Sequence, residues 1–262
     1  MKLYGVVLIA LVGLLMGSPC LADWQKDVEA ANAAKEAEKY EEAIQLYTKA
    51  LDTKQVPVNP YTMQGFNVTE NKINEMTVRG DLAACLYMKK DIEGAIGQYS
   101  ELMKVYAPMA QQAKDSALLD VIRKTQILYI VYGGRSMYYA QNKQYDLAIA
   151  DLEAGLKLKS DADYLYKELA WLFATCPEEA YRNAKRALEY ANQAVAKEKD
   201  AVSLTLLAAA YAENGNFEEA VKTQEQATSQ PEAQKYLESY KAGKPWRSEP
   251  WNPLALDVIG IK

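Results

Sequence analysis

Between residues 24 and 240, apolar residues recur three or four positions apart instead of in strict alternation. One stretch shows this clearly, with Leu204, Leu207, Ala208 and Tyr211 at positions i, i+3, i+4 and i+7. Side chains at this spacing lie on one face of an α-helix and form a buried stripe. The pattern therefore predicts an all-α chain built of amphipathic helices.

A short motif recurs five times along this part of the chain. In each copy an Ala is followed by an aliphatic residue, and a second small or apolar residue stands seven positions after the Ala. The five pairs are Ala43-Ile44, Ala95-Ile96, Ala148-Ile149, Ala187-Leu188 and Ala220-Val221. Three positions before each Ala stand Tyr40, Ile92, Tyr145, Ala184 and Phe217, and in four of the five a large apolar or aromatic residue opens the second helix of a pair.

A partner helix with its own small residue precedes each copy. Twelve positions before the leading Ala these residues are Ala31, Ala83, Ser136 and Ala208, and in the fourth copy Ala170 stands seventeen positions before. Two helices that approach more closely than the usual 8–10 Å need small side chains where they cross. Each copy is therefore predicted to be one tightly packed helical hairpin.

The repeated unit resembles the tetratricopeptide repeat family. The best match is Leu-Leu-Ala-Ala-Ala-Tyr-Ala-Glu-Asn-Gly-Asn-Phe-Glu-Glu-Ala-Val at 206–221, and Tyr-Glu-Glu-Ala-Ile-Gln-Leu-Tyr-Thr-Lys-Ala-Leu at 40–51 matches the second half of a unit. The resemblance implies a right-handed superhelical solenoid over residues 23–243. Its units are expected at about 24–52, 70–105, 120–160, 163–198 and 201–230, with a capping helix at 232–242 and an extended tail at 244–262.

The repeats depart from the family period of about 34 residues. Successive leading alanines lie 52, 53, 39 and 33 residues apart, so the first three gaps contain insertions. The first, Asp52 to Thr69, contains Pro and Gly and is predicted to be a loop. The second, Val105 to Leu119, is helix-compatible apart from Pro108 and is expected to extend the neighbouring helices. In the third, Pro177 is expected to end one helix, and Glu178-Glu179 suit the start of the next.

The C-terminal half carries a more specific resemblance. Three segments are similar to those of a subgroup of bacterial tetratricopeptide proteins: Ala-Trp-Leu-Phe-Ala-Thr-Cys-Pro at 170–177, Leu-Ala-Ala-Ala-Tyr-Ala-Glu at 207–213 and Gly-Lys-Pro-Trp-Arg at 243–247. That subgroup has no agreed activity. The resemblance therefore implies a fold and a bacterial host, and no particular reaction.

The first 22 residues are typical of a secretory signal peptide. Lys2 precedes 14 apolar residues, Leu3 to Met16, and small residues lead to an expected cleavage after Ala22. An apolar helix of this length spans only about 21 Å, less than a bilayer core of about 30 Å. We expect an exported protein, periplasmic or extracellular. A membrane-tethered assembly factor that keeps the segment is an alternative, and only then is membrane contact expected.

Composition narrows the chemistry. The chain of 262 residues has no His, which excludes triads and metal sites that use imidazole, and its formal charge of −5 does not favour nucleic acid. No cofactor, metal or catalytic residue is predicted. Cys85 and Cys176 fall in different units, too far apart for the Cα separation of at most about 7 Å that a disulfide allows.

The resemblance implies a concave groove, lined by the first helix of each unit, that binds a peptide or a partner protein. Its predicted lining is Asn32, Lys35, Tyr87, Met88, Met137, Tyr164, Lys167, Trp171 and Thr205, together with Gln25, Val28, Thr77, Ile130, Gln141, Val202 and Glu213. The predicted function is an exported interaction scaffold without catalysis. A small-molecule binder or enzyme with a cleft beside residues 52–69 is the other alternative.

Overall fold

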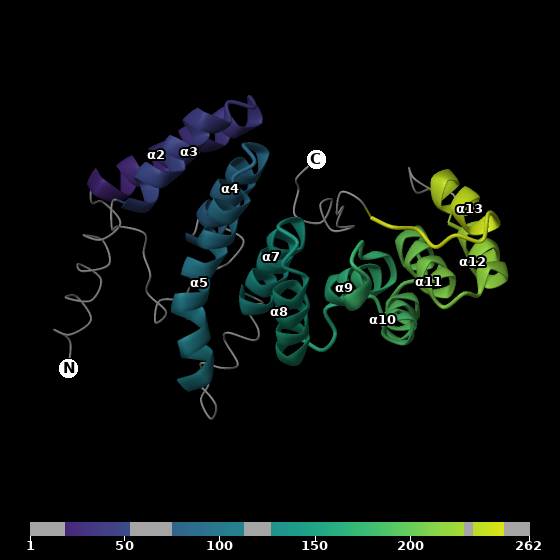
Figure 1. Ribbon diagram of the computed structural model, residues 1–262. Helices are drawn as coiled ribbons and strands as arrows, with labels where there is room; N and C mark the ends of the chain where they lie inside the picture. The colour runs from purple at the N-terminus through teal and green to yellow at the C-terminus, as the bar shows by residue number, and fades with distance from the viewer. Residues whose placement is uncertain (1–18, 53–74, 113–126, 228–232, 249–262) are drawn as a thin grey trace. The chain divides into compact units, whose positions relative to one another are not determined.

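The computed structural model describes residues 19–52, 75–112, 127–227 and 233–248 (Figure 1). These residues form eleven α-helices and one 3-10 turn, and none of them lies in a strand, which confirms the all-α prediction. In this part of the chain, no helix has the length and apolar character needed to cross a membrane. The apolar segment predicted as a signal peptide and most of the 52–69 insertion lie outside the described residues.

Contacts divide the chain into two units, 1–102 and 103–262. Unit 1 contains α2 (Pro19–Glu36), α3 (Tyr40–Asp52), α4 (Glu75–Met88) and the first half of α5 (Ile92–Gln112). Helix α5 continues through Pro108, as the helix-compatible second insertion predicts. The core of this unit is formed by small and large apolar residues, chiefly Trp24, Val28, Ala31, Ala43, Tyr47, Val78, Leu82 and Cys85.

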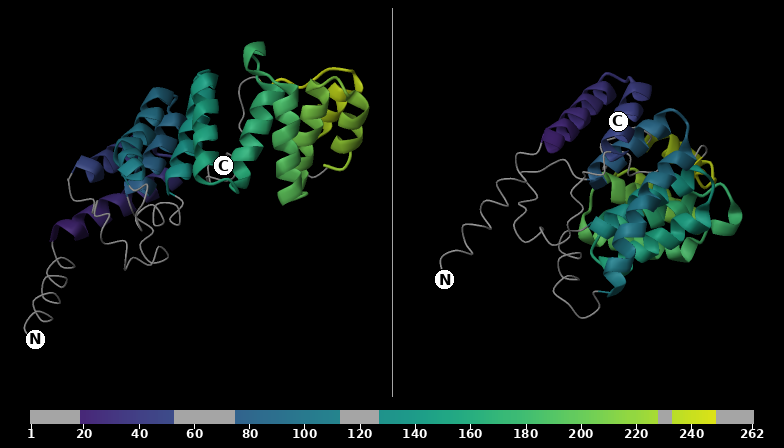
Figure 2. Two further views of the ribbon diagram at one scale, coloured as in Figure 1. Left: turned by 90° about the horizontal axis from the view of Figure 1, so that it is seen from below. Right: turned by 90° about the vertical axis from the view of Figure 1, so that its left-hand side faces the viewer.

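Unit 2 contains three helical pairs and a last single helix. The pairs are α7 (Ile127–Gln141) with α8 (Tyr145–Leu158), α9 (Asp163–Thr175) with α10 (Ala184–Lys197), and α11 (Ala201–Glu213) with α12 (Phe217–Gln224), followed by α13 (Ala233–Lys241). Helices α9 to α12 stack in succession (Figures 1 and 2), and α13 packs against α12. Each hairpin thus buries its apolar face against its neighbours, as in a helical solenoid.

The predicted starts of the second helices are confirmed. Helices α3, α5, α8, α10 and α12 begin at Tyr40, Ile92, Tyr145, Ala184 and Phe217. The small residues of the motif are all buried: Ala31, Ala83, Ser136, Ala170 and Ala208 on the first helices, and Ala43, Ala95, Ala148, Ala187 and Ala220 on the second. The repeated pattern therefore marks positions that helix packing buries.

The link between α9 and α10 differs from the prediction in one respect. Helix α9 ends at Thr175, before Pro177, as predicted. The acidic pair Glu178-Glu179 does not start the next helix, because residues 179–181 form a 3-10 turn. Helix α10 begins at Ala184, where the side chain of Asn183 accepts a hydrogen bond from the Arg186 N–H. An Asn N-cap satisfies this free N–H directly, which an acidic residue inside the first turn does not.

The other four pairs are joined by the same tight turn. Two residues before the second helix, Glu38, Lys90, Lys143 and Gly215 have φ values of 58°, 66°, 59° and 77°. In the third pair, the Lys143 N–H donates to Ala140 at 3.1 Å and the Gln144 N–H to Tyr139 at 2.8 Å. These two bonds define a Schellman turn, which places its C′ residue in the left-handed region. Three of the four turns hold a residue other than Gly there.

Replacing Lys143 with Gly is expected to stabilise the fold, because Gly reaches this left-handed conformation without steric cost. The gain should be about 0.5–1 kcal/mol in the free energy of unfolding, measured from urea unfolding curves. Gly215→Ala at the equivalent position is the matched control and should lose about 1 kcal/mol. A destabilised Lys143→Gly variant would contradict the turn assignment.

Candidate functional site: the end of helix α9 and the C-terminal segment

Helix α9 ends in a way that leaves backbone carbonyls without partners from its own helix. In a continuing helix the N–H of residue 177 would donate to the Phe173 carbonyl, but Pro177 has no N–H. The Asn183 N–H takes its place and donates to Phe173 at 2.9 Å. The next carbonyls, of Ala174 and Thr175, therefore need donors from elsewhere.

Residues 244–248, here called the C-terminal segment, supply these donors. After α13 the chain turns at Gly243, where φ is 68°, and runs back past α11 to the end of α9 (Figures 1 and 2). The Ser248 N–H donates to the Thr175 carbonyl at 3.0 Å, and Arg247 Nη1 donates to the Ala174 carbonyl at 3.3 Å. The end of α9 is thus capped by residues more than 70 positions away in the sequence.

A second arginine completes the cap from the other side. Arg182 Nη1 donates to the carbonyls of Cys176 at 3.1 Å and Pro177 at 3.0 Å. The Cys176 N–H donates to Leu172 at 3.0 Å. All six carbonyls from Leu172 to Pro177 therefore accept a hydrogen bond, which is the condition for ending a helix in a crowded place.

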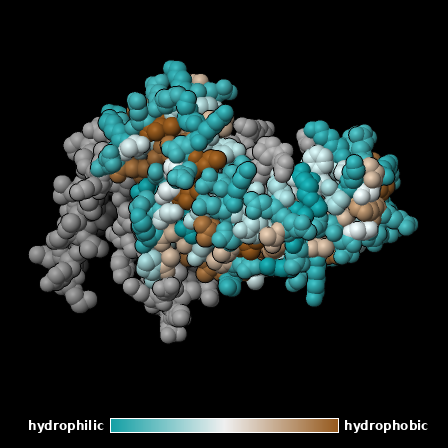
Figure 3. Space-filling view, in the orientation of Figure 1, coloured by the Kyte–Doolittle hydropathy of each residue, from teal (hydrophilic) through white to brown (hydrophobic). Residues whose placement is uncertain are grey.

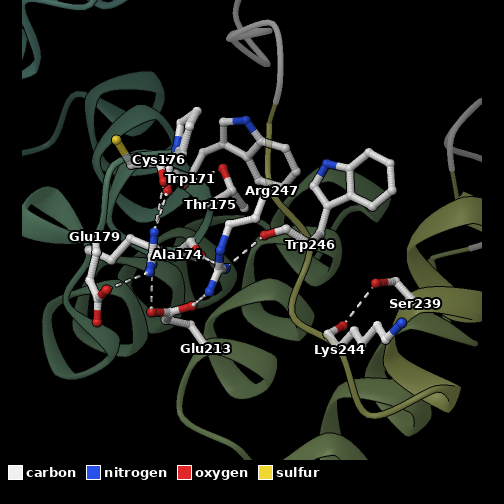
Figure 4. A network of polar contacts seen from close by, with 12 residues as sticks. Trp171, Ala174, Thr175, Cys176, Glu179, Glu213, Ser239, Lys244, Trp246 and Arg247 are labelled. Carbon is white, nitrogen blue, oxygen red and sulfur yellow. Dashed lines mark hydrogen bonds and ion pairs between the residues drawn. The ribbon is translucent and has the colours of Figure 1, made fainter.

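The two arginines share one carboxylate, that of Glu213 at the end of α11 (Figure 4). Arg182 Nε lies 3.2 Å from Glu213 Oε1, and Arg247 Nη2 lies 2.8 Å from Glu213 Oε2. The Glu213 side chain is only 14% exposed, so water screens these pairs little. Glu213 thereby ties the C-terminal segment to the link between α9 and α10.

Aromatic rings fill the space beside this polar network. The Tyr236 ring of α13 makes edge contacts with Trp171 of α9, at 5.7 Å between ring centroids, and with Trp246 of the C-terminal segment, at 5.0 Å. Edge-to-face geometry at these distances is favourable for aromatic pairs. The cluster joins α9, α13 and the C-terminal segment through side chains, beside the hydrogen bonds to the backbone.

Several predicted groove residues of unit 2 do not line an open surface. Met137, Trp171 and Thr205 are 4%, 2% and 0% exposed, so none of the three lies on an open surface in this structure. Trp171 is covered by Tyr236, and Thr205 accepts a hydrogen bond from Gln224 of α12. A helical wheel places the three residues correctly on α7, α9 and α11. It takes no account of segments further along the sequence that pack over these helices.

The polar groove residues of unit 2 meet groups of the same chain. Lys167 lies between Asp163 at 2.8 Å and Asp200 at 3.0 Å, and although desolvation opposes the charge, both carboxylates raise the pKa of Lys167. The Tyr164 hydroxyl donates to the Tyr129 carbonyl at 2.9 Å. Glu213, also predicted to face a partner, binds Arg182 and Arg247 instead. These contacts hold neighbouring hairpins together.

In unit 1 the predicted groove residues divide into paired and exposed groups. Asn32 accepts a hydrogen bond from the Tyr47 hydroxyl, and Lys35 Nζ lies 2.6 Å from Asp81 on α4. Val28, predicted to line the groove, is buried in the core of the unit. Tyr87 is half-buried, whereas Met88 at the end of α4 is 42% exposed. Met88 is therefore the exposed apolar residue of the predicted unit 1 set, beside the exposed polar residues Gln25 and Thr77.

Both described cysteines are free and buried, as predicted. Burial raises the pKa of the Cys85 and Cys176 thiols to about 11. Thiols of this kind are poor nucleophiles near neutral pH. Among the side chains that the structure describes, no group of three His, Cys, Asp or Glu residues is arranged to hold a metal ion.

Comparison with known protein families finds a match in two stretches of the chain. A tetratricopeptide repeat family model matches residues 129–161, which span α7 and α8, and residues 201–238, which span α11, α12 and part of α13. These two stretches, in separate helical pairs of unit 2, are similar to tetratricopeptide repeats.

One solved structure similar to this chain is that of a thermophilic tetratricopeptide protein from Thermus thermophilus. It shares 16% sequence identity over 84% of this chain and 98% of that chain, with a TM-score of 0.49. A search of the curated proteins finds no match.

Sequence reasoning missed the residues that close the site. Arg182, Tyr236, Trp246 and Arg247 were not among the predicted groove residues. The sequence did single out Ala170–Pro177 and Gly243–Arg247 as separate segments of one resemblance. The structure brings these segments into contact, and no local pattern in either one encodes that contact.

Glu213→Gln is expected to lower the free energy of unfolding by about 2 kcal/mol, because two partly buried arginines lose their carboxylate. Glu179→Gln is the matched control: its carboxylate also faces Arg182, at 4.0 Å, but it is 93% exposed and should change stability by less than about 0.5 kcal/mol. Urea unfolding measures both variants. Equal losses would show that Glu213 is not the centre of the network.

Cys85 and Cys176 are expected to resist alkylation in the native protein. With a pKa of about 11, roughly one thiol in a thousand is ionised at pH 8, and burial limits access further. Mass spectrometry of peptides after iodoacetamide treatment should show both residues modified only in denaturant. Rapid modification of Cys176 in the native state would mean that the end of α9 opens readily.

Proposed function

We propose that this protein is an exported interaction scaffold that binds an extended peptide or a partner protein along its first helices. One observation carries the proposal: the face of α9 and α11 already holds an extended segment, that of its own residues 244–248. The segment is held by a backbone hydrogen bond, an arginine–carboxylate pair and an aromatic contact. Proteins use these same contacts to hold extended peptides.

The apolar surface of unit 1 supports a protein partner. Figure 3 shows hydrophobic residues gathered over α3 and α4 on the visible face. Ile44, Leu51 and Leu86 pack only partly into the core of this unit, and Met88 is exposed. Grouped apolar residues on a surface are typical of protein-binding sites.

A small-molecule site has less support in the described residues. A depression of about 500 Å³ is lined by Ile44, Gln45, Thr48, Lys49 and Asp52. All five residues lie on one helix, α3, so they form an open surface instead of an enclosing chamber. Sites for small ligands usually bury most of the ligand between several elements.

Export and host type are part of the same proposal. The apolar segment 3–16 and the small residues up to Ala22 support a cleaved signal peptide and a periplasmic or extracellular location. The three segments of the C-terminal half support the bacterial subgroup. We assign the protein no catalytic role, because the sequence contains no His and the described thiols are buried.

A photo-crosslinking amino acid placed at Met88 should capture a specific protein in envelope extracts of the producing cell. The matched control is the same substitution at Glu42, an exposed position on the second helix of a pair in unit 1. Crosslinked species are identified by mass spectrometry and counted only if they are absent from the control. No captured species, together with a metabolite that raises the melting temperature, would contradict the scaffold proposal.

A further inference from the structure

We infer that the face formed by α9, α11 and α13 is a gated peptide site. Its ligand is an extended segment carrying an aromatic residue followed by arginine, and residues 244–248 occupy the site until such a ligand displaces them. The inference rests on the proposed function and adds two statements to it: the chemistry of the bound segment, and the group that blocks the site.

The chemistry of the ligand follows from what release of the C-terminal segment would leave behind. Glu213 would keep only Arg182 as its ion-pair partner, and the Ala174 and Thr175 carbonyls would lose their donors. Tyr236 would lose its edge contact with the Trp246 ring and keep its contact with Trp171. The open face therefore presents a carboxylate, two carbonyls and aromatic rings.

A peptide that fits this face must carry the complementary groups. A backbone N–H can donate to Thr175, a guanidinium can reach both Glu213 and Ala174, and an aromatic ring can pack against Tyr236. An acidic residue at the arginine position would meet the Glu213 carboxylate and be repelled. The site therefore selects an aromatic–arginine pair and rejects acidic segments.

In the part of the chain that the structure describes, the C-terminal segment belongs to no helix, so it can detach while the helices stay folded. It is joined to the fold on its N-terminal side by the turn at Gly243, where the Ser239 hydroxyl donates to the Lys244 carbonyl at 2.9 Å. Lys244 itself is exposed, and Trp246 and Arg247 are only half-buried. A short strap of this kind opens locally without unfolding the helices beneath it.

The short connection also sets how strongly the segment competes. A group tethered next to its site acts as if present at roughly millimolar concentration. A free peptide with the same contacts must therefore overcome this competitor, whereas a partner that adds contacts elsewhere on the protein can exceed it. The tethered segment therefore raises the affinity that a ligand needs in order to bind, which excludes short peptides that bind weakly.

The inference is tested with a labelled peptide of residues 243–248, acetyl-Gly-Lys-Pro-Trp-Arg-Ser-amide, and three full-length proteins. The Trp246→Ala/Arg247→Ala double variant should bind the peptide in fluorescence anisotropy, because its own segment no longer competes. The wild type and the Lys244→Ala control, whose exchanged side chain is exposed, should bind at least about tenfold more weakly. Peptides with Ala in place of Trp or Arg should bind the double variant at least about tenfold more weakly than the parent peptide.

Each outcome bears on the inference. Equal binding by the wild type and the double variant would overturn the gate and leave peptide binding intact. No binding to a double variant whose helical circular dichroism matches the wild type would overturn the ligand assignment. The proposed function is judged separately by crosslinking at Met88, which lies in unit 1 and does not depend on residues 244–248.

A second measurement uses only the wild-type chain, in case the double variant does not fold. Hydrogen exchange followed by mass spectrometry should show protected amides in the 244–248 fragment, because the Ser248 N–H is bound to Thr175. An isotopically distinguished peptide at millimolar concentration should speed this exchange several-fold, and the Arg-to-Ala peptide should not. Unchanged exchange at saturating peptide would overturn the inference.

Discussion

The carbonyl groups at the end of α9 are the constraint on which the C-terminal half of unit 2 depends. Pro177 stops the helix and removes the donor that would serve Phe173, so the last turn must find partners outside the helix. Asn183 and Arg182 supply some from the following link, and Arg247 and Ser248 supply the rest. The end of α9 is thus completed by residues that lie some 70 positions later in the sequence.

The hairpins were predictable because the forces that form them are local. Each pair of helices buries small residues such as Ser136 and Ala148, and both positions repeat in the sequence. The second helix of each pair begins three residues before its Ala, so the motif predicted that α8 begins at Tyr145. A hairpin contacts mainly its neighbours, so periodicity over some 30 residues carries most of the required information.

The site was not predictable in the same way, because its contacts join segments that are distant in the sequence. The helical wheel placed Trp171 on a free face of its hairpin, and within that hairpin alone the assignment is correct. Its ring is contacted by Tyr236, 65 residues later, and Tyr236 in turn contacts Trp246. Pro177 was recognised as a helix end, but nothing near it indicates that Arg247 would serve as a donor. The aromatic residues that join these distant segments do not recur at a regular spacing, so no repeat in the sequence reveals them.

The donors that cap α9 differ in how they are attached, and this difference decides which of them can exchange. Asn183 and Arg182 belong to the link that joins α9 to α10, so they cannot leave without unfolding the hairpin. Arg247 and Ser248 reach α9 from a turn that follows α13, and within the described residues no helix continues beyond them. A ligand that replaces Arg247 and Ser248 keeps every carbonyl satisfied while the hairpins stay folded. The cap of α9 thus has a permanent half and an exchangeable half, and Glu213, bonded to an arginine from each half, is where an incoming guanidinium would be recognised.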